Sequence, residues 1–462
     1  MKKSIFIIII LLSFKVKSQE KASIEIPETY ELSNIILALT EYGISDKWEV
    51  QKNTDYYKEV LEFFKPMNNH PLLDSVNYSR EKWEDYLSFR TDAVSFSFDN
   101  NGDLKREFEF YTNTGHNPFD KNLDLINDFV IKSNFRTFFR EHQDFYNRLI
   151  NNYSDYNYIK ETIVFLDSKI GKSKTDKDNS IYKIILSPLV YRMNCHRNLS
   201  DNIVADFPSA TEDFVNGLNN NKNIEDRLNS NHLIFTEKDH EYINPITYKK
   251  LNLVKSNFDT DIWDNNSGYQ QENSFNEYLT WAVYELFLEE KFPKYSDKLS
   301  TYWQYQNASR GFFAQNIFSE KVKELYKKKK KEKFSEIYEP LLKWTKKIER
   351  KISLPKLINI NKENFVKINS KNIKLEFSER MNSKLPFGLE IREFKDGKAT
   401  GNKEFKEIID FKWTQRGKIV NFNLDTNYKE FALIFNWWGI EKPLVSKNGV
   451  FLAPSSYILL KK

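Results

Sequence analysis

The sequence contains a single cysteine, Cys195, among its 462 residues. One cysteine cannot form an intrachain disulfide, so no covalent framework stabilises the fold. A catalytic thiolate would need a nearby base, and His196 adjoins Cys195 in the sequence. Because neighbouring residues of a strand point to opposite faces, we expect Cys195 to be structural.

Long apolar runs are also scarce. The run Ile5–Phe14 is shorter than the roughly 20 residues that a helix needs to cross a bilayer. Two lysines precede it, and Val16 and Ser18 occupy the minus-three and minus-one positions before Gln19. This pattern predicts a cleavable signal peptide over residues 1–18. We therefore expect the mature chain to be exported, to the periplasm or to the outside of the cell.

The remainder of the chain carries no second membrane signal. No later run is long and apolar enough to span a bilayer, so no membrane span is expected. No cysteine lies near the predicted cleavage point, and this excludes a lipid anchor on the new N-terminus.

An excess of one charge sign is missing as well. The net charge of +5 comes from 70 basic and 65 acidic residues spread along the chain, which leaves no basic face for nucleic acid. The one basic run, Lys327–Lys331, lies beside Glu324 and Glu332, as expected of a solvated helix end. Aromatic residues make up 15% of the sequence, so the chain can bury a large core.

Apolar spacing predicts a mostly helical main domain over residues 19–351. Residues recur at helical intervals in several segments. Helices are predicted over 32–39, 57–64, 135–150, 158–170 and 274–290, with another near Thr236. Two strands are predicted, one over 93–98 and one over 181–193 that bends at Pro188.

After residue 351 the pattern changes from helical to alternating. Short runs separated by Gly, Asn and Lys-Asp-Gly turns predict strands. These runs are 371–377, 388–394, 408–413, 419–423 and 430–435. We therefore predict a small β-sandwich over 357–462 and an α+β protein as a whole.

The segment from Phe235 to Pro245 contains the most informative motif. On a helix, Thr236, Glu237 and His240 share one face, because residues three and four apart are neighbours. Zinc peptidases of the zincin type use H-E-x-x-H in this geometry, with two zinc-binding histidines and a general-base glutamate. Here Thr236 stands in place of the first histidine. An ion pair on a helix surface is the alternative explanation of an E-x-x-H spacing.

A third metal ligand is predicted on the helix that follows. Glu277 lies among large apolar residues, where a carboxylate is costly unless a partner satisfies it. A glutamate on the helix surface is the alternative. The predicted strand ending near Met193 precedes the motif helix, in the zincin order of edge strand, metal helix and ligand helix.

These features resemble a family of exported bacterial proteins catalogued as domain-of-unknown-function family 4932, which is itself similar to zincin metallopeptidases. The resemblance extends from about Glu31 to Trp344. It rests on the stretches Tyr57–Pro71, Tyr182–Pro188, Glu237–Pro245, Asn276–Ala282 and Asn307–Phe313, and on the helix ending at Trp344.

The family pattern is H-E-x-x-H followed by an aromatic residue, an aliphatic residue, Asn and Pro. Glu237, His240, Asn244 and Pro245 match it, and Thr236 departs from it. The resemblance implies a zincin-like fold, zinc as cofactor, Glu237 as general base and a peptide or protein as ligand.

Few other residues are candidates to replace the missing histidine. His232 lies about 12 Å from His240 along a helix, too far to share one ion, and Asp239 points to a different face. Arg310 is a candidate to neutralise Glu277 or Glu237 in place of a metal. Structural or capping roles are expected for the remaining histidines, which are His70, His116, His142 and His196.

Two functions follow from this motif. In one, the chain is an exported zincin-like hydrolase that acts on peptides. In the other, it is an inactive pseudo-peptidase that binds a partner in the cell envelope. In the C-terminal region, Ile373–Asn382 and Pro454–Tyr457 resemble parts of bacterial immunoglobulin-like domains, which implies binding or spacing rather than chemistry.

Overall fold

The structure is a computed structural model that describes residues 23–110, 115–173, 180–191, 194–217, 223–264, 267–269, 271–328, 334–358, 364–437 and 442–462. The predicted signal peptide, residues 1–18, lies outside the described residues. The chain is α+β, as predicted, with helices through most of its length and a C-terminal region rich in strands. No helix within these described ranges is both long and apolar enough to span a membrane.

The first part of the chain is a group of short helices around one core. Its helices are α1 Glu28–Leu39, α2 Glu41–Ser45, α3 Asp55–Phe63, α4 Pro71–Ser75, α5 Trp83–Asp92, α6 Pro118–Lys121, α7 Leu123–Ser133, α8 Phe135–Glu141, α9 Gln143–Tyr156 and α10 Ile159–Lys169. α1 is buried along nearly its whole length and forms the centre of this core. The single helix predicted over 135–150 is two helices, because the chain leaves helical geometry at His142.

The strand predicted over 93–98 is only half strand. Ala93–Ser95 is a 3₁₀ turn, and β2 Phe96–Phe98 pairs with β3 Leu104–Arg106. The Ser95 hydroxyl donates a hydrogen bond to the Asp92 carbonyl at 2.6 Å, which holds the chain in the turn. Such local side-chain bonds compete with strand pairing.

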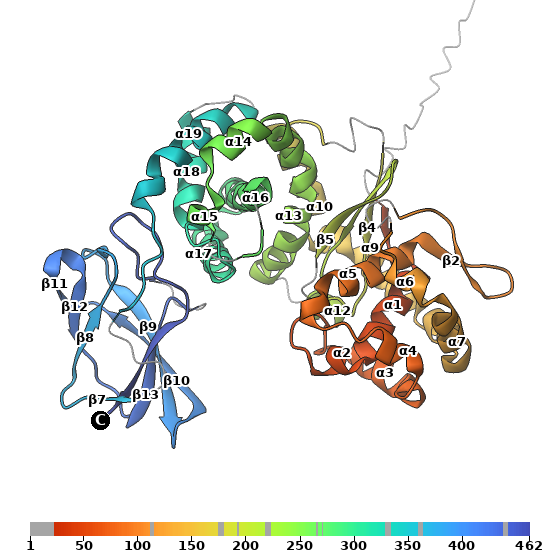
Figure 1. Cartoon of the computed structure of the whole chain (residues 1–462), viewed down its shortest axis with the longest axis horizontal. Coiled ribbons are helices and arrows are strands. Elements are labelled where there is room, and N and C mark those ends of the chain that lie inside the picture. The colour runs from red at the N-terminus through yellow and green to blue at the C-terminus, as the bar shows by residue number, and fades with distance from the viewer. Residues whose placement is uncertain are drawn as a thin grey trace, which may run out of the picture.

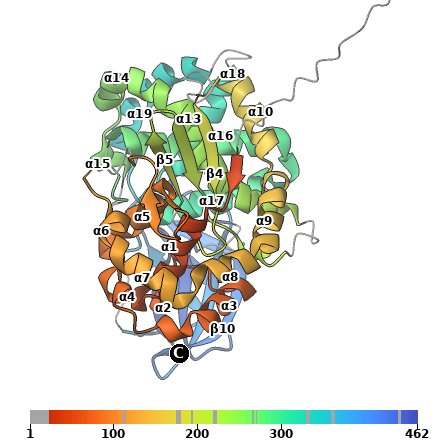
Figure 2. The same cartoon turned by 90° about the vertical axis from the view of Figure 1, so that its right-hand side faces the viewer.

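A four-stranded sheet joins the two helical parts of the chain. Its strands are β1 Ser23–Glu25, β4 Ile181–Ile185, β5 Cys195–Ser200 and β6 Ile203–Phe207. The order is β1-β4-β6-β5, with β1, β4 and β6 parallel and β5 antiparallel at the edge. The sheet lies between the N-terminal helices and the later helices (Figure 1, Figure 2).

The predicted strand 181–193 is therefore shorter and more central than expected. β4 ends at Ile185, and Pro188 lies in the loop beyond it. Proline lacks the amide proton that a central strand needs, so the strand stops before it. The edge strand beside the later helices is β5, which the sequence analysis did not predict.

The second helical part packs around one long buried helix. Its helices are α13 Ile224–Lys249, α14 Leu251–Asn257, α15 Thr260–Trp263, α16 Gln271–Lys291, α17 Pro293–Ser309, α18 Gln315–Lys328 and α19 Tyr338–Ile348. Phe165 and Leu166 of α10 also belong to this core, whereas the short helix α12 Glu212–Val215 packs on the first core. α16 carries large apolar residues on every side and lies inside the ring of its neighbours (Figure 1). A helix that is apolar all round is a core helix.

The C-terminal region consists of two sheets with a common core. One sheet has the order β10-β9-β13-β14-β7 and the other β11-β12-β8. The strands are β7 Val366–Lys367, β8 Asn372–Glu376, β9 Phe387–Lys395, β10 Lys398–Ile408, β11 Phe411–Thr414, β12 Ile419–Asn423, β13 Glu430–Phe435 and β14 Ser456–Lys461. Apolar residues of both sheets, from Leu357 to Leu460, form one cluster.

A fragment from Leu357 to Lys462 is expected to fold alone, because this core contains only its own residues. Contacts to the helices include the Phe451 ring stacked on Tyr305 at 4.9 Å and a 2.6 Å hydrogen bond from Asn448 to the Lys351 carbonyl. Circular dichroism of the fragment should be of β type, with cooperative thermal unfolding. A disordered fragment would show that the region is an extension of the main core.

Candidate functional site

Helix α13 carries the predicted motif in the middle of a 26-residue span. It begins at Asn223, whose side chain accepts a hydrogen bond from the amide of Glu225 at 3.1 Å, a common N-cap. Pro245 lies inside the helix one turn after Glu241 and removes one backbone hydrogen bond there. The helix continues past it to Lys249, so Glu237, His240 and Asn244 keep helical spacing.

α13 lies between the sheet and α16 (Figure 1). Two side-chain contacts fix its register on α16. Thr247 donates a hydrogen bond to Asn276 Oδ1 at 2.6 Å, and the Thr280 hydroxyl approaches the Thr236 carbonyl at 3.4 Å. Glu277 lies between Asn276 and Thr280 on α16, so these contacts hold it beside the motif.

The structure brings His240 and Glu277 together. His240 Nε2 lies 3.4 Å from Glu277 Oε1, and both side chains are mostly buried. On its other nitrogen, His240 Nδ1 lies 3.3 Å from Asn244 Oδ1. His240 thus contacts Glu277, the second ligand predicted from the sequence, and Asn244 of the motif.

The separation between His240 and Glu277 suits a shared zinc ion. It is that of a long hydrogen-bonded contact between the imidazole and the carboxylate. Two ligands at about 2.1 Å from a tetrahedral zinc ion lie about 3.4 Å apart. His240 and Glu277 therefore fit as two ligands of one ion.

The carboxylate of Glu237 accepts no hydrogen bond from any residue that the structure describes. Burial raises its pKa from 4.5 to about 7; the charges of Asp206 and Glu277 act in the same direction, while His240 and His196 oppose it. A carboxyl group with a pKa near neutrality is suited to general-base catalysis.

The imidazole of His240 is cationic at neutral pH in this arrangement. Burial alone lowers its pKa, but the hydrogen bond and charge of Glu277, with the charges of Glu237 and Asp239, outweigh burial and raise it to about 9. A zinc ion would have to displace this proton, so zinc binding would release it.

Thr236 does not offer its hydroxyl to the site. The hydroxyl donates a hydrogen bond to the His232 carbonyl of its own helix at 3.1 Å. The side chain is buried, and its oxygen is engaged one turn back along α13. Residue 236 therefore contributes no ligand.

Arg310 does not neutralise the site directly. Within the described part of the chain it forms no ion pair with Glu277 or Glu237. Its guanidinium lies 5.3 Å from the Trp281 ring centre and hydrogen-bonds to Tyr269. The negative charge of Glu277, followed by burial, raises the pKa of Tyr269, so this phenol lies close to the site.

The other histidines of the N-terminal part form ion pairs outside the site. His70 contacts Asp128, His116 contacts Asp85, and His142 contacts Glu59. These pairs agree with the structural roles predicted for them.

Two further residues of α13 are buried in its packing surface. His232 stacks on Trp303 at 3.6 Å, and burial followed by the charge of Arg310 lowers its pKa. Asp239 is fully buried, and burial raises its pKa to about 7. Burial thus disfavours the charged form of each.

A second polar group, which no sequence motif indicated, lies on the sheet side of α13. His196, Asp206 and Glu241 each bring a ligand atom within 4.8 Å of the others, a grouping that could hold a metal ion. His196 Nδ1 lies 2.6 Å from Asp206 Oδ1, and the Tyr182 hydroxyl donates to the other oxygen of Asp206. His196 was expected to have a structural or capping role, because only the tertiary fold can bring it to other polar groups.

A lysine already occupies part of this second group. Lys238 Nζ lies 3.1 Å from Glu241 Oε1 and 3.3 Å from the centre of the Tyr182 ring. Lys238 and Glu241 are both buried. The charge of Glu241 is thus balanced without a metal.

The Cys195 thiol is buried, and burial raises its pKa. This supports the structural role predicted for it, because a nucleophilic cysteine needs a lowered pKa.

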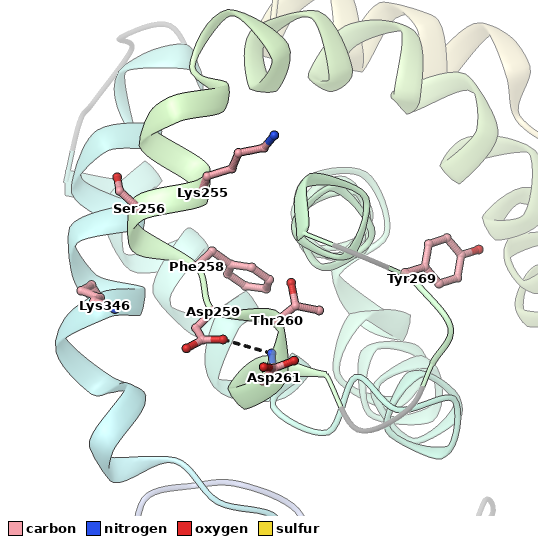
Figure 3. A pocket seen from close by; sticks show the side chains of 8 residues that line it. All are labelled: Lys255, Ser256, Phe258, Asp259, Thr260, Asp261, Tyr269 and Lys346. Carbon is pink, nitrogen blue, oxygen red and sulfur yellow. Dashed lines mark hydrogen bonds between the residues drawn. The ribbon is translucent and has the colours of Figure 1, made fainter.

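A hollow of about 400 Å³ opens beside α14, α15 and α19. Figure 3 shows Lys255, Phe258, Asp259 and Lys346 on one side of the end of α16, and Tyr269 on the other. Tyr269 is the lining residue that connects this hollow with Glu277. No histidine is among the residues that line the hollow.

No protein-family model and no curated protein matches the chain. It is similar to the solved structure of the N-terminal part of the bacterial S-layer protein SbsC, with 11% identity over 52% of this chain and 53% of that chain and a TM-score of 0.18. SbsC domains 1–6 give 10% identity over 52% and 41% of the two chains, also with a TM-score of 0.18. The chain thus spans about half the length of the first of these structures, and likenesses at this TM-score carry no argument about fold or function.

Proposed function

We propose that this chain is an exported, zincin-like, metal-dependent peptide hydrolase. The observation that carries the proposal is the 3.4 Å approach of His240 Nε2 to Glu277 Oε1, with Glu237 one turn before His240 on the same helix. His240 and Glu277 would hold a zinc ion. A signal-peptide pattern over residues 1–18 supports export.

Each residue has a distinct role in this proposal. A zinc ion at His240 and Glu277 would polarise a peptide carbonyl and acidify a water molecule. Glu237 takes one proton from the attacking water and later gives it to the leaving amine, so it ends the reaction unprotonated. Asn244 fixes the His240 ring by accepting a hydrogen bond from Nδ1, and the Thr247–Asn276 contact keeps α13 and α16 in register.

One observation favours the second candidate function, an inactive peptidase fold that binds a peptide or protein. The Thr236 hydroxyl is bonded to its own helix, so the residue at the first zincin ligand position supplies nothing to a metal. The proton on His240 already gives Glu277 a cationic partner. A site of this kind is stable without zinc.

Zinc titration calorimetry distinguishes the two functions. Thr236→His is expected to raise zinc affinity at least tenfold, about 1.4 kcal/mol, because it restores an imidazole four residues before His240. His240→Ala should abolish the zinc binding of the wild type. Zinc binding should also release the His240 proton, which calorimetry in buffers of different ionisation enthalpy detects.

The possible results assign the function. A wild type that binds one zinc ion, lost in His240→Ala, supports the hydrolase. If the wild type binds no zinc but the Thr236→His variant binds it, the result supports the inactive, peptide- or protein-binding function. If neither binds a divalent ion, the zincin comparison is wrong at the site.

A further inference from the structure

The longest strand of the C-terminal region lies at an open edge of its sheet. β10 is the first strand in the order β10-β9-β13-β14-β7 and pairs with β9 (Figure 1). No other described segment forms a backbone hydrogen bond with β10. The backbone groups along its outer side can therefore pair with an added strand.

Only part of β10 is regular enough to serve as such a template. Its register on β9 shifts between Ala399 and Lys403, and from Lys403 to Ile408 the pairing is continuous. Because side chains alternate along a strand, Ile408, which is buried in the core of the two sheets, marks the inner face. Phe405 lies on the outer face and is 54% exposed, so a large apolar ring stands in the middle of the open stretch.

The charges of this stretch are complementary to themselves. From Lys403 to Glu407 the sequence reads Lys-Glu-Phe-Lys-Glu. Two copies related by a two-fold axis perpendicular to the sheet would pair antiparallel, with each residue pair occurring twice. With the axis at Phe405, Lys403 of one copy faces Glu407 of the other. In the same register Glu404 faces Lys406.

The register centred on Phe405 is distinguished from its neighbours by charge. A two-fold axis at Lys403 or Lys406 would place two lysines opposite each other. An axis at Glu404 or Glu407 would place two glutamates opposite each other. Like charges directly opposite destabilise a strand pair, whereas opposite charges and paired aromatic rings stabilise it. Within this stretch, the axis at Phe405 is the one that avoids a like-charge pair.

We propose that the chain forms a two-fold dimer through β10, in which the C-terminal sheets of two copies join into one continuous antiparallel sheet. The partner is a second copy of this chain, because the charges of β10 match those of β10 itself. The two Phe405 rings meet at the axis, and two opposite-charge pairs lie on each side of it. This proposal is independent of the zinc site.

Sedimentation velocity of the chain from Gln19 onward, over a range of protein concentrations, tests the dimer. The wild type is expected to dimerise reversibly. Lys403→Glu turns two attractive pairs into repulsive ones and is expected to weaken dimerisation by at least about tenfold. Glu407→Lys should do the same, although Glu407 also contacts Lys442 of its own chain at 2.6 Å. Lys412→Glu, the same change on the exposed edge strand β11 of the other sheet, is the matched control and should leave dimerisation unchanged.

Mixing the two variants separates a lost interface from a misfolded chain. Lys403→Glu and Glu407→Lys should each be largely monomeric alone and should form a heterodimer when mixed, because each pair then joins opposite charges again. The double variant in one chain should dimerise as the wild type does, for the same reason. A wild type that stays monomeric would overturn the proposal. So would a dimer that Lys403→Glu leaves intact, or single variants that do not associate when mixed.

Discussion

Replacing Glu237 with glutamine is expected to lower peptide hydrolysis by about 10²–10⁴-fold, the usual contribution of a general base. Glutamine has the same shape but cannot accept the proton of the attacking water. Because Glu237 is not a metal ligand in the proposal, zinc affinity should change by less than about threefold. Wild type and variant, each with one equivalent of zinc, would be compared on a mixture of unstructured peptides by mass spectrometry.

The unfolding midpoint of the Glu237→Gln variant is a second measurement. The Glu237 side chain is partly buried and accepts no hydrogen bond from a described residue, and burial raises its pKa to about 7. The neutral amide should therefore not lower the unfolding midpoint at pH 8. Glu225→Gln, three turns earlier on the same helix and on its surface, is the control for helix changes. Unchanged hydrolysis in Glu237→Gln would remove Glu237 from the mechanism.

In the wild type, the free energy of unfolding is expected to fall by about 2 kcal/mol between pH 5.5 and 8.5 because of Glu31. Replacing Glu31 with glutamine is expected to remove this fall. Glu31 lies fully buried in α1, where Tyr56 donates a hydrogen bond to it at 2.7 Å and Tyr56 in turn contacts Tyr146 at 2.6 Å. Burial raises the pKa of Glu31 from 4.5 to about 7, while hydrogen bonds from Tyr56 and Ser187 and the charge of His142 lower it.

The direction in which stability changes with pH follows from proton binding. Between pH 4.5 and 7 the folded state holds a proton on Glu31 that the unfolded state has released, so stability falls as pH rises. The contribution is fully present below pH 4.5 and is lost as pH passes 7, about 3 kcal/mol in total. Glutamine does not titrate and avoids this loss.

Urea unfolding of wild type and Glu31→Gln at the two pH values would measure the difference directly. Glu41→Gln, on the exposed start of α2, should leave the pH dependence unchanged. A variant that follows the wild-type pH dependence would show that Glu31 is ionised in the folded chain.

Helical periodicity was sufficient to predict the helices that pack a continuous apolar face. α1, α3, α10 and α16 occur close to the predicted segments, because their apolar residues recur every three to four positions. The strands β8, β9, β12 and β13 were predicted for a similar reason, since each has an alternating or apolar run bounded by turn residues.

Strands without an apolar pattern could not be predicted. β10 is exposed along most of its length, and β5 is an edge strand with the polar sequence Cys195–Ser200. Each pairs with its neighbour along the chain, β10 with β9 and β5 with β6, and is held by those backbone hydrogen bonds instead of by an apolar face of its own. The Asp201–Asn202 turn between two short runs was the one local signal for the β5–β6 hairpin.

The candidate site was likewise predictable from the sequence only in part. Spacing along a single helix determined that Glu237, His240 and Asn244 lie within one or two turns, since 3.6 residues per turn is a property of the backbone. The sequence also indicated that Glu277 needs a partner, because a carboxylate among large apolar residues is costly. Only the tertiary structure decided that this partner is His240, that Arg310 stays with Tyr269, and that His196 and Asp206 meet α13 from the sheet. Such contacts depend on how α13, α16 and β5 pack against one another, and no periodicity within one segment encodes the register between separate segments.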